Sequence, residues 1–185
     1  RAVPDAVLRL PRLRELDLSR NELLRALPDD LAALESLETL DVTETALEAL
    51  PADPDAYDER VGHRLVIELN KARMQSQGLI EARDELASLV ETMQAAPDAD
   101  DTLLRDARQA LARAQFLKTW LMRLEGLDRK VWEPEIEAAR QNWRWLAEQA
   151  PTEAEKTLHC EDLEAAVRLA RMEMEDLQGL PLPSE

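Results

Sequence analysis

The stretch LPRLRELDLSRNELLRALPDDLAALESLETLDVTETALEALP, residues 10–51, decides the fold of the N-terminal part of this chain. Its pattern repeats: the leucines at positions 13, 16, 18 and 23 return 24 residues later as Leu37, Leu40, Val42 and Leu47, and Asn21 returns as Thr45. Both halves then reach a Leu-Pro pair, at residues 27–28 and 50–51. The register extends backwards as well, since Val3, Pro4 and Val7 match Leu27, Pro28 and Leu31, so about two and a half repeats are visible.

This spacing, LxxLxLxxNxL followed by LPxxLxxL, resembles the leucine-rich repeat. The resemblance implies parallel strands near residues 15–19 and 39–43, with the leucines turned inward and a short helical segment on the convex side. One repeat cannot bury its own leucines, and about three are usually needed for stability. Two explanations stay open: further repeats precede Arg1, or the helices that follow cap the stack. The chain begins within the pattern and without Met, which favours a fragment or a processed form.

The outward positions of the two expected strands form a candidate binding surface. They are Glu15, Asp17 and Ser19 on the first strand, and Thr39, Asp41 and Thr43 on the second. The strand face of such a repeat commonly binds protein, so these residues are interpreted as an acidic patch for a basic ligand. The alternative is a solvated surface on an acidic protein.

The composition excludes several classes of protein. Acidic residues outnumber basic residues 39 to 23, which gives a net charge of −16. Nucleic acid and anionic membranes attract basic surfaces, so we expect neither as a partner. No apolar run approaches the roughly 20 residues of a membrane-spanning helix, so no membrane insertion is expected. With a single cysteine, the chain has no internal disulfide.

After Pro51 the apolar spacing changes to that of amphipathic helices. Five helices with short connections are expected, which is typical of an antiparallel bundle. Their ends are predicted from Gly78, from Pro97, from Asp100 or Asp101, from Gly126, and from the capping box of Thr152 and Glu155. Pro134 would stand in the first turn of the fourth helix. The predicted fold is therefore mainly α, with leucine-rich repeats over residues 1–53 and a helical bundle over residues 54–185.

Cys160 is the only thiol and lies in the fifth expected helix. The apolar stripe of this helix would consist of Cys160, Leu163, Val167, Ala170, Met174 and Leu177. A cysteine on such a stripe is most simply a buried small hydrophobic residue. The alternative is a nucleophile, which needs an accessible thiol. His159 is a poor partner for it, because adjacent residues on a helix point about 100 degrees apart.

Repeats followed by helices and a Cys-x-Asp motif resemble the novel E3 ligase family of bacterial effectors. The resemblance implies that Cys160 accepts ubiquitin as a thioester and that Asp162 supports it. Leu163 stands where that family usually has arginine. A second class of repeat-containing effectors, with a cysteine-independent helical ligase domain, is also similar in architecture. Either resemblance implies a partner such as a ubiquitin-conjugating enzyme or a host protein.

Trp145 is the remaining candidate contact residue. Trp143 falls on the apolar stripe of its helix, whereas Trp145 lies roughly 200 degrees away. Trp145 is therefore exposed for a partner or packed against another helix. No phosphate-binding loop, cofactor fingerprint or metal-ligand spacing is present, so we expect neither cofactor nor metal. The sequence predicts a protein-recognition module, cytoplasmic or secreted into a host cell, and its alternative function is that of a ubiquitin ligase.

Overall fold

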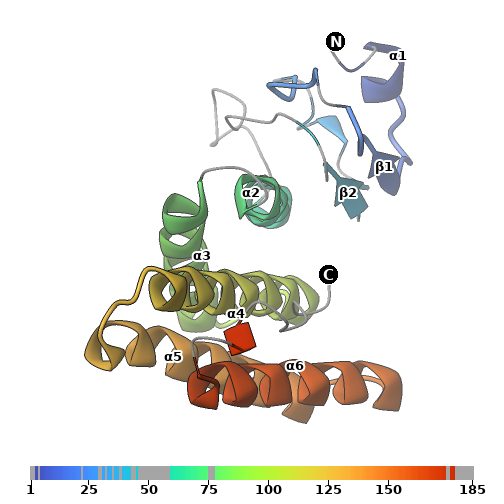
Figure 1. Ribbon diagram of the computed structural model, residues 1–185. Coiled ribbons are helices and arrows are strands. Elements are labelled where there is room, and N and C mark those ends of the chain that lie inside the picture. Colours follow the sequence, from blue (N-terminus) through green and yellow to red (C-terminus); the bar gives the residue numbers. More distant parts are fainter. Residues whose placement is uncertain are drawn as a thin grey trace. The chain divides into compact units, whose positions relative to one another are not determined.

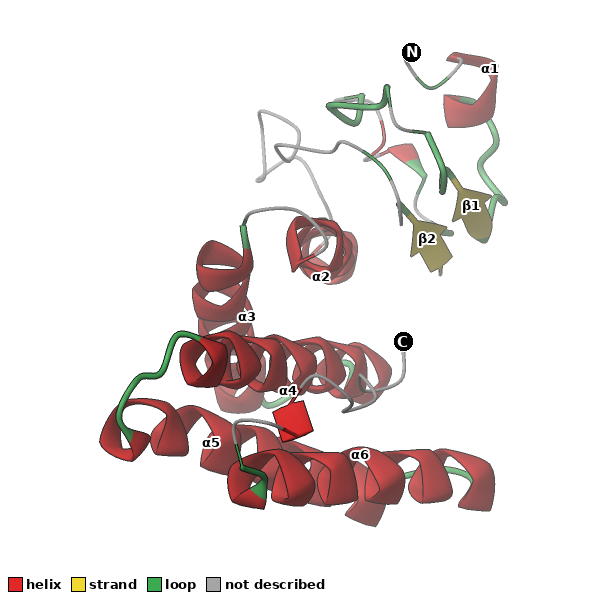
Figure 2. Ribbon diagram, in the orientation of Figure 1, coloured by secondary structure: helices red, strands yellow, loops and turns green. Residues whose placement is uncertain are grey.

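A computed structural model shows a mainly helical chain, as predicted from the composition (Figure 1). It describes residues 3–45, 59–74, 78–173 and 176–177, apart from residues 4, 22, 29, 30, 32, 35, 38, 43 and 44. The described elements are six helices and one parallel pair of strands (Figure 2). In chain order they are α1 (Asp5–Leu8), β1 (Glu15–Asp17), β2 (Thr39–Asp41), α2 (Glu59–Met74), α3 (Leu79–Ala95), α4 (Asp101–Leu124), α5 (Arg129–Glu148) and α6 (Glu153–Arg171).

The chain forms two compact units, Arg1–Leu103 and Leu104–Glu185. The boundary expected between residues 53 and 54 lies outside the described residues. The structure groups α2 and α3 with the repeated segment instead of with the later helices. The expected domain of residues 54–185 is therefore divided between the two units.

Two segments of the first unit share backbone features that lie 24 residues apart. β1 and β2 are parallel, and Leu16 pairs with Leu40 in the ladder. The amides of Leu10 and Leu13 donate to the carbonyls of Val7 and Leu10, and those of Leu34 and Leu37 repeat these bonds with Leu31 and Leu34. The parallel pairing expected from the sequence spacing is thus confirmed over residues 15–17 and 39–41.

Helix α2 shares its core with the repeated segment. Val61, Leu65 and Leu69, spaced four residues apart on one face, belong to the same buried cluster as Leu16 and Leu40. These three apolar residues therefore lie on the buried face of α2.

The second of the two 24-residue segments is buried more deeply than the first. Leu34 is 1% exposed, whereas its counterpart Leu10 is 48% exposed. Val7, Leu13 and Leu18 are only partly buried against the core, whereas Leu31, Leu37 and Val42 are fully buried. The difference follows from position, because the second segment packs between the first segment and α2.

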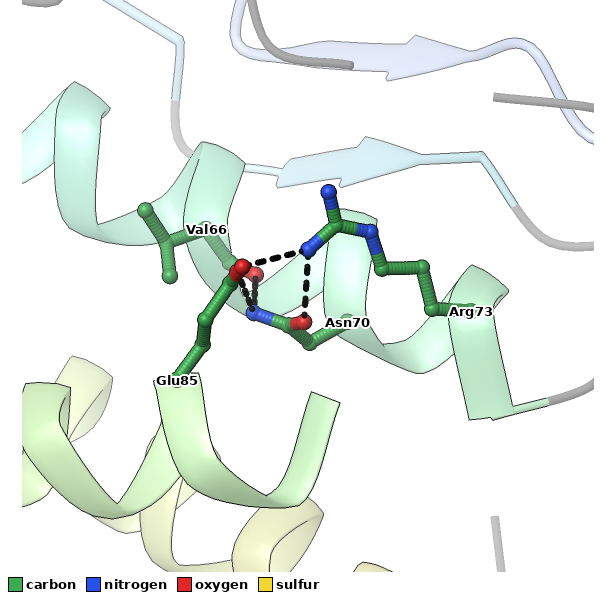
Figure 3. Close-up of polar contacts among 4 residues, drawn as sticks. All are labelled: Val66, Asn70, Arg73 and Glu85. Carbon is green, nitrogen blue, oxygen red and sulfur yellow. Dashed lines mark hydrogen bonds and ion pairs between the residues drawn. The ribbon is translucent and has the colours of Figure 1, made fainter. Parts of the chain in front are cut away.

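A polar cluster joins α2 to α3 (Figure 3). The side-chain amide of Asn70, which is fully buried, donates to the carbonyl of Val66 at 2.9 Å and to Glu85 Oε2 at 3.2 Å. The Arg73 guanidinium donates to the other Glu85 oxygen at 2.7 Å and to Asn70 Oδ1 at 3.5 Å. The buried asparagine is satisfied in this way, as a buried polar group must be.

The second unit contains α5, α6 and most of α4. α5 and α6 pack against each other and are joined by a four-residue connection, residues 149–152, so they run antiparallel. Trp143 is fully buried and meets Phe116 edge to face, with ring centroids 5.8 Å apart. The core position predicted for Trp143 is therefore confirmed.

Local sequence signals set three of the helix ends. Asp100 Oδ1 accepts hydrogen bonds from the amides of Thr102 and Leu103, as an N-cap does. Gly126, at φ +74°, follows α4, and the amides of Gly126 and Leu127 donate to the carbonyls of Arg123 and Met122. This is the Schellman pattern of a helix C-terminus. Thr152 caps α6 by accepting from the amide of Glu155 at 3.2 Å.

Two helix predictions need correction. Pro134 is not in the first turn of its helix, because α5 begins one turn earlier, at Arg129. Helix α6 ends at Arg171, before the predicted end of its apolar stripe. Leu177 is nevertheless fully buried, because the chain after the helix folds back into the core. There the Trp120 indole donates to the Leu177 carbonyl at 3.2 Å, and the Arg123 guanidinium donates to the carbonyls of Leu169 and Met172.

Candidate functional site

The predicted strand-face residues lie on one surface of the first unit where the structure describes them. Glu15 and Asp17 are exposed on either side of the buried Leu16, and Asp41 is partly exposed at the ladder position next to Asp17. Thr43 and the side chain of Thr39 lie outside the described residues. The structure therefore brings three carboxylates to this surface, which agrees with the acidic patch expected from the sequence.

Ser19 has a local role beside this surface. Its backbone amide donates to Asp17 Oδ1 at 2.9 Å. Hydrogen bonds from the hydroxyl and the amide of Ser19, with a smaller contribution from the charge of Arg20, hold the pKa of Asp17 below its usual value. Asp17 therefore stays ionised at neutral pH.

The turns that follow β1 and β2 are built in the same way. The Asn21 side-chain amide donates to the carbonyl of Leu18 at 2.7 Å. The Thr45 hydroxyl donates to the carbonyl of Val42, three residues back, also at 2.7 Å. The two residues stand 24 positions apart, and the threonine hydroxyl replaces the asparagine amide as the donor.

Trp145 is half-buried and belongs to a polar layer between α4 and α5. The Arg108 guanidinium carbon lies 4.3 Å from the centroid of its ring, a cation–π arrangement. Arg108 also donates to Asn142 Oδ1 at 2.9 Å, and the Asn142 amide donates to Gln115 Oε1 at 3.1 Å. Burial lowers the pKa of Arg108 from its ordinary value. Of the two interpretations of Trp145, the structure favours packing against another helix, because the side chain is half-buried and contacts Arg108 of α4.

Cys160 is exposed, so the interpretation that made it a buried hydrophobic residue is wrong. The apolar spacing of the sequence predicts a stripe of α6 that includes it, but the buried face of that helix is rotated away from it. The buried residues are His159, Asp162, Ala165, Ala166 and Leu169. Leu163, Val167 and Ala170, which share the predicted stripe with Cys160, are only partly buried. The thiol therefore meets the first requirement of a nucleophile, which is access.

Cys160 is one of the residues that line a surface hollow of about 470 Å³. The hollow lies between the end of α5 and the first turns of α6, and its lining includes Arg144, Ala147, Lys156 and Leu163. Lys156 precedes Cys160 by one helical turn, so both side chains stand on the same face of α6. The Lys-x-x-x-Cys spacing is the one sequence signal that would have pointed to this pair.

The structure does not bring Cys160 and Asp162 together. Residues two positions apart on a helix point about 200 degrees apart. Accordingly Asp162 is 4% exposed and lies on the buried face of α6, whereas Cys160 faces the hollow. Asp162 is therefore not placed to support the thiol in the arrangement that α6 adopts here.

His159 is buried beside Asp162, at 5% exposure. Its Nδ1 atom has no hydrogen-bond partner in the described part of the chain. Burial lowers the pKa of His159 below its ordinary value, and the carboxylates of Asp162 and Glu155 offset only part of this effect. His159 is therefore a neutral core residue at neutral pH.

The described residues form no metal site, because no group of three or more histidine, cysteine, aspartate and glutamate side chains among them is arranged to hold a metal ion. None of the helices that the structure describes has the length and hydropathy needed to cross a bilayer. No protein-family model matches this sequence, and neither a curated protein nor a solved structure matches the chain.

Proposed function

We propose that this chain is a protein-recognition module of the leucine-rich-repeat type found in bacterial effectors. Its first unit would be the end of a repeat solenoid, with α2 as the cap of the stack. The strand face would bind another protein, in the cytoplasm or in a host cell.

The observation that supports this proposal is the 24-residue equivalence within the first unit. Strand pairing, turn hydrogen bonds and inward apolar positions all recur at this interval. Asn21 and Thr45 donate to equivalent carbonyls in the two turns. A chain that stacks successive coils in this way presents their outward side chains side by side on one face, the surface that such repeats use for binding.

On that face the binding residues would be Glu15, Asp17 and Asp41, with the neighbouring Ser19, Thr39 and Thr43. Glu15 and Asp17 project from one strand, two residues apart, so a partner meets both charges at once. Such a surface favours a partner with a basic patch, because complementary charge speeds association and selects the partner. Trp145 stands apart from this proposal, in the second unit.

A crosslinking experiment tests this function. A photoreactive residue is placed at Ser19, the crosslinked protein is identified by mass spectrometry, and its affinity is then measured by calorimetry. We expect Glu15→Lys to weaken binding about tenfold or more, because it reverses a charge at the contact. Glu91→Lys makes the same charge change at an exposed site on α3 and serves as the control. Equal effects of the two variants would contradict a specific role for the strand face.

A second candidate function, a cysteine-dependent ubiquitin ligase, is favoured by the exposure of Cys160 in its hollow. In this reaction the Cys160 thiolate would attack the thioester carbonyl between ubiquitin and the conjugating enzyme. A new thioester would form on Cys160, and the conjugating enzyme would leave as a thiolate. A lysine amine of the substrate would then take the ubiquitin, releasing the Cys160 thiolate.

A ubiquitination reaction with activating enzyme, conjugating enzyme and ubiquitin distinguishes the possibilities. If Cys160 is the nucleophile, the wild-type chain forms a thiol-sensitive adduct that Cys160→Ala abolishes. Cys160→Ser would trap an ester that resists thiols but not hydroxide. Equal ubiquitin chains from the wild type and Cys160→Ala would indicate a cysteine-independent ligase. If neither the wild type nor the variants form a product, the ligase function is excluded and the recognition module remains.

A further inference from the structure

The outer edge of β1 pairs with no other strand in the described part of the chain. β1 and β2 form a two-stranded sheet, so β1 has a neighbouring strand on one side only (Figure 2). The Leu18 amide donates to the Asp41 carbonyl at 2.8 Å, so the backbone groups of Leu18 point toward β2. Successive residues of a strand direct these groups to opposite sides. Glu15 and Asp17 therefore direct their amides and carbonyls away from β2, to the free edge.

A free edge of this kind is a template for a further strand. Its backbone N–H and C=O groups can pair with an extended segment, the mode of recognition called β-augmentation. An added strand continues both faces of the sheet, so its side chains come to lie beside those of β1. The side chains of β1 therefore select the segment that fits.

The residues of β1 favour a segment with the pattern basic–apolar–basic. Glu15 and Asp17 are exposed on one face, and Leu16 between them is buried on the other. Asp17 already stands beside Asp41 of β2. A further acidic residue on its free side would add repulsion, whereas a basic residue would relieve it. Beside Leu16, an apolar residue would extend the buried face.

The arginines that flank β1 in sequence leave this face acidic. Arg14 precedes Glu15 and, by the alternation of an extended chain, points to the other face. Arg20 lies in the turn after the strand. The hydrogen bonds from Ser19 lower the pKa of Asp17 most, and the charge of Arg20 contributes least. Arg14 and Arg20 also take part in further interactions of their own.

We propose that β1 binds an extended segment of another protein along its free edge, with basic residues beside Glu15 and Asp17 and an apolar residue beside Leu16. This proposal rests on the strand-face function and adds the form of the partner, which is a strand. A second copy of this chain does not fit the same edge. A two-fold contact between two β1 strands is antiparallel and sets Glu15 of one copy opposite Asp17 of the other, so like charges meet.

Binding of a synthetic peptide to the full chain tests the proposal. The probe is Ser-Thr-Lys-Val-Lys-Thr-Ser with blocked ends and a fluorescent label, and fluorescence anisotropy measures its affinity. We expect the double variant Glu15→Gln/Asp17→Asn to bind the peptide about tenfold more weakly than the wild type, because both side chains keep their shape and lose their charge. Glu91→Gln, at an exposed site on α3, is the control and should bind as the wild type does.

Methylation of the peptide backbone separates strand pairing from charge attraction. Methyl groups on the lysine amides block one edge of the peptide strand, and a methyl group on the valine amide blocks the other. Only one edge can pair with β1, so one methylated peptide should bind at least about tenfold more weakly and the other about as the parent does. Bound peptide should also slow hydrogen exchange of the Glu15 and Asp17 amides, whereas the Leu18 amide, already bonded to β2, should change little.

The outcomes distinguish the free edge from the strand face as a whole. Equal affinities of the two methylated peptides, with weaker binding to the charge variant, would overturn strand pairing and leave the strand-face function intact. A wild-type chain that does not bind the parent peptide would also overturn the proposal, as would self-association of the chain through this edge. The strand-face function fails separately, if crosslinking at Ser19 returns no partner whose binding Glu15→Lys weakens.

Discussion

Replacing Leu65 by alanine should destabilise the first unit by about 3 kcal/mol. Leu65 is 3% exposed and lies on the face of α2 that shares its core with the leucines of both 24-residue segments. The substitution removes three carbon atoms from this core, at about 0.8 kcal/mol each, and leaves a cavity that adds to the loss. If α2 were only a linker beside the repeats, the same substitution would cost less than about 1 kcal/mol.

Hydrogen exchange of individual amides measures this loss where it occurs. A loss of about 3 kcal/mol should accelerate exchange roughly 150-fold for the slowest amides of β2 and α2, because each 1.4 kcal/mol is a factor of ten. The four tryptophans all lie in the second unit, so their fluorescence reports on that unit separately. Ile80→Ala is the matched control, because Ile80 is 59% exposed in the same unit and should change stability by less than about 0.5 kcal/mol. Equal effects of the two substitutions, or no effect of Leu65→Ala on the amides of β2, would refute the assignment of α2 to the repeat core.

Three further predictions concern single residues. Burial lowers the pKa of His159 in the folded chain, so the imidazole is neutral in both the folded and the unfolded chain above pH ~6.5. As the pH falls below that value, the unfolded chain binds the proton first, and the free energy of unfolding therefore decreases. His159→Gln should reduce the loss of unfolding free energy between neutral pH and acidic pH, and His63→Gln, at the chain's other histidine, is the control. Gly126→Ala should lower the free energy of unfolding by about 1 kcal/mol, because φ at this position is +74°. Gly62→Ala should raise it by about 0.5–1 kcal/mol, because this glycine lies inside α2 and the added methyl group meets open space. Thermal unfolding of both variants checks these opposite signs. Cys160 should react with a chromogenic disulfide reagent in the folded chain at nearly the rate of the denatured chain, and slow, unfolding-limited labelling would contradict its exposure.

The repeated segment shows how far spacing alone can predict structure. The 24-residue interval predicted the two strands, and the parallel pairing of residues 15–17 with residues 39–41 agrees with it. This was predictable because a repeat makes the same local contacts in each copy, so pattern and structure share one period. The depth of burial was not predictable. Leu10 and Leu34 occupy equivalent positions, and only their neighbours in space make one exposed and the other buried.

Helix α6 shows where spacing stops being sufficient. Its sequence carries apolar residues on two faces, one with Leu163, Val167 and Ala170, and the other with Ala165, Ala166 and Leu169. The predicted apolar stripe follows the first face, whereas the structure buries the second. The choice changed the interpretation of Cys160 from a core residue to an exposed thiol. Cys160 and Asp162, two residues apart in the motif that resembles the ligase family, lie on opposite faces of this helix, so the choice of face buries Asp162 and exposes Cys160.

The sequence by itself determined the local features of this protein: the helices, several of their ends, and the parallel pairing of two strands. Their signals lie within a few residues or within one repeat, as in the caps at Asp100, Gly126 and Thr152. Only the tertiary structure decided which face of α6 is buried, that α2 belongs with the repeated segment, and that Leu177 returns to the core after its helix ends. The physical reason is that burial depends on the surface that each element meets. That surface is formed by residues far away in the sequence, whose positions no local spacing encodes.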